Sequence, residues 1–70
     1  MNKLQIQILA YNPSSVAPWV RIIFDECHLW AIFGDTKNEV LNPDAEPINI
    51  TEYPELIQGY AIEKVEVYEV

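Results

Sequence analysis

The stretch from Trp19 to Phe33 constrains the fold more than any other part of the chain. Eleven of its fifteen residues are apolar, and both tryptophans lie in it. The chain has 70 residues, and a protein of this length buries only about 60% of the surface that its unfolded chain exposes. There is room for one small core, and this stretch must supply most of it. We therefore expect a single small domain over residues 1–70.

Two conformations compete for this stretch. As a buried helix over residues 18–33 it would have one narrow polar stripe and would end at Gly34. As a hairpin it would form strands over residues 19–24 and 29–33. Its β-branched and aromatic residues lose side-chain freedom in a helix and pack well on a pleated sheet, which favours the strands. We predict the hairpin and keep the helix as the alternative.

The connection between these two strands is the polar run from Asp25 to His28. It has no Gly or Asn to adopt a positive φ, so we expect a loop longer than a two-residue type I′ turn. Cys27 and His28 are the candidate metal ligands or nucleophilic pair here. Neighbouring residues of a strand point to opposite faces, and a zinc site needs four ligands, whereas the chain has one Cys and one His. We therefore interpret Cys27 as a small buried residue and His28 as half-exposed, and we expect no metal, cofactor or catalytic residue.

Both ends of the chain predict further strands. Residues 4–8 alternate apolar and polar side chains, which predicts a half-buried strand over residues 3–10. Residues 60–69 are rich in strand-forming types, but Tyr60 and Ile62 are out of phase with Val65 and Val67. A β-bulge near residues 63–64 would reconcile the two halves of that strand.

The intervening region is polar and irregular. Residues 36–47 contain closely spaced Asn and Pro, which predicts a surface loop with at most a short strand at 39–41. A short strand should follow at 47–50. Thr51 then looks like the N-cap of a short helix over 52–58. The predicted fold class is α+β: a mainly antiparallel sheet of four to five strands with one short helix.

Composition excludes several classes of function. The longest uninterrupted apolar run has five residues, too short to span a bilayer, and no secretory h-region is visible, so we expect no membrane insertion. A single cysteine permits no internal disulfide, which favours a reducing, cytoplasmic location. Four basic residues against eleven acidic ones argue against direct nucleic-acid binding. The two glycines are isolated and no carboxylate pair stands out, so the chain is not expected to be an enzyme.

The distribution of charge is the most informative feature for function. Residues 1–34 are formally neutral, so the whole net charge of −7 arises from residues 35–70. Such asymmetry favours docking of the acidic half on a basic surface of a larger protein. The candidate partner-binding residues are seven acids and the two tryptophans: Asp44, Glu46, Glu52, Glu55, Glu63, Glu66, Glu69, Trp19 and Trp30.

The predicted function is therefore that of a small, acidic, non-enzymatic protein-binding module. It would act as an inhibitor that occupies a nucleic-acid-binding surface of a larger protein, as phage anti-defence, immunity and antitoxin proteins do. Half of the residues are apolar, which is a high fraction for a protein of 70 residues with little interior in which to bury them. The alternative is an accessory subunit or a homo-oligomer whose apolar face is the interface, with the acids serving only solubility.

Overall fold

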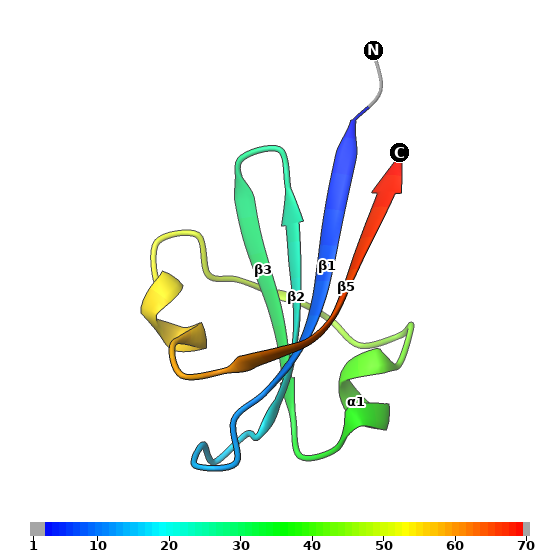
Figure 1. Ribbon diagram of the computed structural model, residues 1–70. Helices are drawn as coiled ribbons and strands as arrows, with labels where there is room; N and C mark the ends of the chain where they lie inside the picture. Colours follow the sequence, from blue (N-terminus) through cyan, green and yellow to red (C-terminus); the bar gives the residue numbers. More distant parts are fainter. Residues whose placement is uncertain (1–2, 70) are drawn as a thin grey trace.

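A five-stranded antiparallel sheet forms the framework of the protein (Figure 1). The structure is a computed structural model and describes residues 3–69. The strands, in chain order, are β1 Leu4–Tyr11, β2 Trp19–Asp25, β3 His28–Gly34, β4 Ile48–Asn49 and β5 Ala61–Glu69. A short α-helix, α1, spans Lys37–Leu41, and one turn of 3-10 helix, η1, spans Pro54–Ile57. The strand order is β4-β3-β2-β1-β5, which confirms the predicted mainly antiparallel α+β class.

The central apolar stretch forms the hairpin β2–β3, and the alternative helix over 18–33 is wrong. Asp25 pairs directly with His28, so the connection is a two-residue turn and not the longer loop that we expected. The chain makes this turn without Gly or Asn because Glu26 adopts a φ of 36°. A non-glycine residue in this region of φ is strained.

Cross-strand pairing assigns the strand side chains to two faces, because directly opposed residues of antiparallel strands lie on the same side of the sheet. We call the first the apolar face. Its members are Leu4, Ile6, Ile8, Ala10, Val20, Ile22, Phe24, Leu29, Ala31, Phe33, Ile48, Ile62, Val65, Val67 and, at the end of β5, Glu69. We call the second the mixed face. It carries Gln5, Gln7, Leu9, Tyr11, Trp19, Arg21, Ile23, Asp25, His28, Trp30, Ile32, Lys64, Glu66 and Tyr68.

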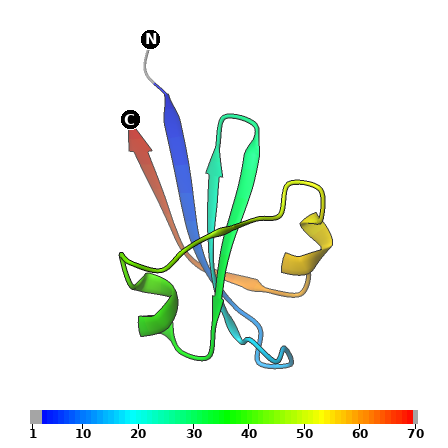
Figure 2. The same ribbon diagram turned by 180° about the vertical axis from the view of Figure 1, so that it is seen from behind.

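Each face is covered over only part of its length. On the apolar face, Ile50, Ile57 and Tyr60 pack against the buried residues of β1, β2 and β3. On the mixed face, Val40 of α1 and Ala45 pack against a second buried cluster. Figures 1 and 2 show α1 and η1 on opposite sides of one half of the sheet, while the β2–β3 turn, the start of β1 and the end of β5 project beyond them.

Helix α1 replaces the loop and short strand that we expected between residues 36 and 47. Thr36 and Glu39 form a capping box: the Glu39 backbone N–H donates to the Thr36 hydroxyl at 3.2 Å, and the Thr36 N–H donates to the Glu39 carboxylate at 3.3 Å. Val40 then anchors the helix on the sheet and is fully buried. Gly34 permits this close approach, since a Cβ there would lie 3.0 Å from the Val40 side chain.

Three details of the C-terminal half bear on the predictions. The helix expected over 52–58 is only the 3-10 turn η1, and Thr51 does not cap it. Instead, the Thr51 hydroxyl accepts a hydrogen bond from the Leu29 backbone N–H at 2.9 Å. The predicted bulge is confirmed, because the β1–β5 register skips Glu63 between Lys64 and Ile62.

The burial of Val40 generates a prediction for stability. Val40→Ala should destabilise the protein by about 2 kcal/mol, because it leaves a cavity between α1 and the sheet. The neighbouring Leu41 is 43% exposed, so Leu41→Ala should cost clearly less. Chemical denaturation of both variants measures the difference. Equal losses would contradict the docking of α1 through Val40.

The turn generates a second prediction. Glu26→Gly and Glu26→Ala both remove the ion pair between Lys3 Nζ and the Glu26 carboxylate, 2.7 Å long and well exposed. Only glycine also removes the steric cost of the positive φ. The glycine variant should therefore melt at a temperature about 4–8 °C above that of the alanine variant. A higher midpoint for alanine in thermal unfolding would show that the turn does not adopt this conformation.

Candidate protein-binding surface

A group of exposed apolar side chains lies on the uncovered part of the apolar face. We call it the open patch, and its five members are between 45% and 65% exposed: Leu4, Phe24, Ile62, Val65 and Val67. Phe24 and Val67 flank the half-buried Ile6 from the two neighbouring strands, so the patch is continuous across β2, β1 and β5. Contiguous exposed apolar surface on a small protein is typical of an interaction site.

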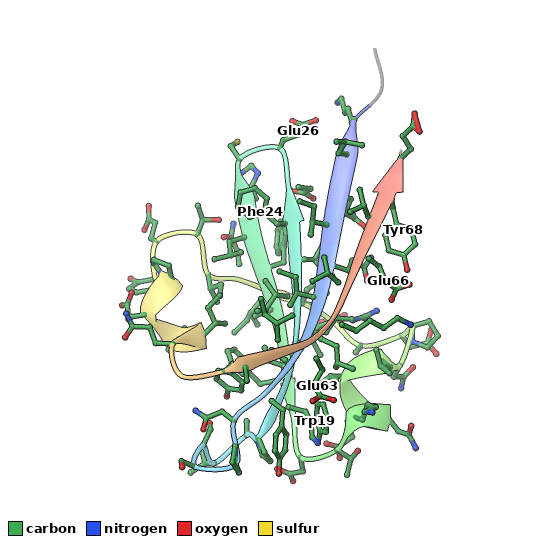
Figure 3. All side chains as sticks on the ribbon, viewed as in Figure 1. Trp19, Phe24, Glu26, Glu63, Glu66 and Tyr68 are labelled. Atoms are coloured by element: carbon green, nitrogen blue, oxygen red, sulfur yellow. The ribbon has the colours of Figure 1, made fainter. Side chains whose placement is uncertain are left out.

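The two tryptophans lie on the mixed face, away from the open patch. Trp19 packs on Tyr11 with ring centroids 4.6 Å apart, and the Lys37 ammonium lies 5.1 Å from its ring. Trp19 is thus occupied by internal contacts beside α1, as Figure 3 shows. Trp30 is half-buried near His28, with ring centroids 6.1 Å apart. The structure therefore does not bring the tryptophans together with the exposed apolar residues.

The candidate acids do not gather on one face of the sheet. Asp44 and Glu46 flank the alanine that packs on the core of the mixed face. Glu52 and Glu55 lie at η1, whose Ile57 packs on the apolar face. These two pairs of acids therefore lie on opposite sides of the sheet.

The remaining three candidate acids lie on β5. Glu63 is the bulge residue and lies toward α1, whereas Glu66 lies beside Tyr68 further along the strand (Figure 3). Glu69 pairs with Leu4 at the end of the sheet. As expected, Glu66 points to the face opposite Val65 and Val67.

Glu66 is the best-defined of these carboxylates. It accepts a hydrogen bond from the Tyr68 hydroxyl at 2.9 Å and lies 3.9 Å from the Lys64 ammonium. The hydrogen bond to Glu66 raises the pKa of Tyr68 above its usual value, because ionisation would remove this donor and place two negative charges side by side. Tyr68 thereby donates to the Glu66 carboxylate on the mixed face, where both side chains are partly exposed to solvent.

Cys27 and His28 are closer than expected but form no recognisable site. Both are exposed at the turn, and Cys27 Sγ lies 3.7 Å from His28 Nδ1, so the expected burial of Cys27 is wrong. No group of three or more His, Cys, Asp or Glu side chains within residues 3–69 is placed to hold a metal ion. The adjacent hollow of about 300 Å³ is shallow, with a lining of mixed charge: Lys3, Leu4, Gln5, Asp25, Glu26, His28 and Trp30.

Comparison of the chain with protein-family models, with curated proteins and with solved structures finds no match. In the part of the chain that the structure describes, no helix is both long and apolar enough to cross a membrane. The functional argument therefore depends on the surface itself. Sequence reasoning named the acids and tryptophans but missed the open patch. The alternation that places Val65 and Val67 on one side of their strand was a signal for it, but Leu4 and Phe24 join the patch only through strand pairing.

The exposure of Cys27 generates a prediction about chemistry. The purified protein should contain no stoichiometric zinc, and native Cys27 should react with a thiol reagent about as fast as in the unfolded chain. His28→Gln should leave the thermal midpoint unchanged. Elemental analysis that finds one zinc per chain would instead show that metal binding supports the fold.

Proposed function

We propose that this protein is a non-enzymatic, cytoplasmic protein-binding module that docks on a larger protein with a basic surface and inhibits it by occupying that surface. The observation that carries the proposal is the open patch next to an acidic strand. Val65 and Val67 of the patch alternate with Glu66, and Glu63 and Glu69 lie on the same strand. Because Glu66 points to the face opposite the patch, the complementary partner would engage the outer edge of β5, with apolar residues on the side of the patch and basic residues on the side of Glu66.

The free energies of burial and association indicate that contacts outside the open patch must contribute to binding. Fully burying an exposed side chain of this size contributes about 1.5–3 kcal/mol, so covering the five half-exposed members contributes on the order of 5 kcal/mol. Association itself costs about 4–15 kcal/mol. The apolar patch alone would therefore bind weakly, and the acids supply both further affinity and a faster encounter with a basic partner.

A second candidate function is favoured by the same patch. A homo-oligomer or an accessory subunit would cover the open patch with apolar surface and would use the acids only for solubility. Ionic strength separates the two functions. A charge-driven complex weakens as salt rises, whereas contact between two copies, each of net charge −7, becomes stronger as their repulsion is screened.

The test combines capture of the partner from host lysate with variants of the two surfaces. Replacing Glu52, Glu55 and Glu66 by Lys should leave the thermal midpoint nearly unchanged, because exposed charges contribute little to stability. The triple variant should bind the captured partner more weakly and with a smaller dependence on salt. Titrations at low and high ionic strength measure both effects.

Variants of single faces locate the docking surface. Glu52 and Glu55 lie on the opposite side of the sheet from Glu66. The double variant Glu52→Lys, Glu55→Lys and the single variant Glu66→Lys should therefore weaken capture of the partner to different extents. The double variant Val65→Ser, Val67→Ser tests the contribution of the open patch without changing the net charge. Unaltered, salt-insensitive capture by the triple variant, together with loss of capture by the serine variant, would refute the charge-driven function and support the apolar alternative.

A further inference from the structure

Strand β5 is the least covered of the four long strands. Eight of its nine residues are exposed, and it lies at the end of the strand order, paired only with β1 among the described strands. No strand within residues 3–69 pairs with its outer edge. An edge strand of this length is a template for pairing with another chain.

The register shows which main-chain groups point outward from β5. In antiparallel sheets, residues alternate between hydrogen-bonded and non-hydrogen-bonded pairs. The two-residue turn makes Asp25 and His28 a hydrogen-bonded pair. When the alternation is followed from this pair across β2 and β1, the N–H and C=O of Glu66 point toward β1. The N–H and C=O of Val65 and Val67 then point away from the sheet.

Two observed hydrogen bonds agree with this alternation. The alternation predicts that Asn12 and Pro18, the pair that follows Tyr11 and Trp19, are hydrogen-bonded. The Asn12 N–H donates to the Pro18 carbonyl at 2.7 Å. The alternation also predicts that the main-chain groups of Leu29 point away from β2. The Leu29 carbonyl indeed accepts a hydrogen bond from the Ile50 N–H at 2.8 Å on that side of β3. The outward direction at β5 therefore follows from the same alternation that holds elsewhere in the sheet.

The side chains of β5 define the chemistry of an added strand. Residues opposite Val65 and Val67 would lie beside the open patch and would have to be apolar. The residue opposite Glu66 would form a non-hydrogen-bonded pair, in which side chains approach most closely. Glu66 already accepts a hydrogen bond from Tyr68, and Lys or Arg at that position would complete a cross-strand ion pair.

A second copy of β5 fits this edge less well. Antiparallel self-pairing centred on Glu66 would place two Glu66 carboxylates opposite each other. Centring on Val65 brings Lys64 opposite Glu66, but it also places Glu63 opposite Val67 and sets the bulge inside the paired region. Strand β5 carries three carboxylates and one ammonium, a net charge of −2, which is complementary to a basic segment rather than to itself.

We propose that β5 takes up an extended segment of a partner protein as a sixth, antiparallel strand, with Lys or Arg opposite Glu66 and apolar residues opposite Val65 and Val67. This inference depends on the proposed function for the basic character of the partner. It adds the mode of binding: main-chain hydrogen bonds to the edge of β5 supply affinity, and alternating side chains supply specificity.

The experiment uses a short capped peptide in which valine and lysine alternate, with a valine–glutamate peptide as the control. The backbone amides of Val65 and Val67 should exchange hydrogen quickly in the free protein and about tenfold more slowly with the valine–lysine peptide. The amide of Glu66 should be protected in both states, because it faces β1. Unchanged exchange at Val65 and Val67 with the peptide bound would overturn the proposal.

N-methylation of the peptide tests the orientation of the added strand. Methyl groups on the valine amides, which face β5, should weaken binding about tenfold or more, whereas methyl groups on the lysine amides should not. Equal effects would mean that charge alone holds the peptide and would refute strand addition. Glu66→Lys should also weaken binding, while Asp35→Lys, with the same change in net charge at an exposed position before α1, serves as the matched control.

The outcome is separable from that of the proposed function. If a basic partner binds through the open patch without pairing, the serine variants at Val65 and Val67 lose the partner although the amides of β5 stay unprotected. If those amides are protected in the free protein, and more so at higher protein concentration, a second copy occupies the edge. That result would overturn the assignment to a basic partner strand.

Discussion

The pairing of Asp25 with His28 across a two-residue turn is the constraint on which the rest of the sheet depends. A slip of one residue in this hairpin would move every side chain of β3 to the other face. The turn fixes the register of β2 against β3, and β1 and β5 follow from their pairing with β2 and with each other. It thereby decides that Val65 and Val67 present both their side chains and their main-chain groups to the outside.

Much of the sheet could be predicted from local sequence. The alternation in residues 4–8 and the phase slip in 60–69 are properties of neighbouring residues, and both the strands and the bulge at Glu63 were found where expected. Helix α1 was missed although Thr36 and Glu39 match a capping box, because the surrounding Asn and Pro residues pointed to a loop. What stabilises so short a helix is the burial of Val40 on a distant strand, which no local pattern reports.

The candidate surface was harder to predict, because coverage of a sheet depends on the path of its connections. Residues 35–47 cross to one face and residues 50–60 to the other, so each face receives only one short covering segment. Within residues 3–69, no further segment packs on the remaining half of the sheet. The same division separates the acids at η1 from those that follow α1, although both groups are close in sequence.

The bulge at Glu63 also limits how far the exposed strand could assemble with copies of itself. Fibrils require long, straight, uninterrupted edges that stack in register. In β5 the regular pairing with β1 runs only from Lys64 to Glu69, and beyond it the strand bends through the extra residue. The edge is thus long enough to hold one short guest segment, but the bulge interrupts it, which disfavours propagation of self-pairing along β5.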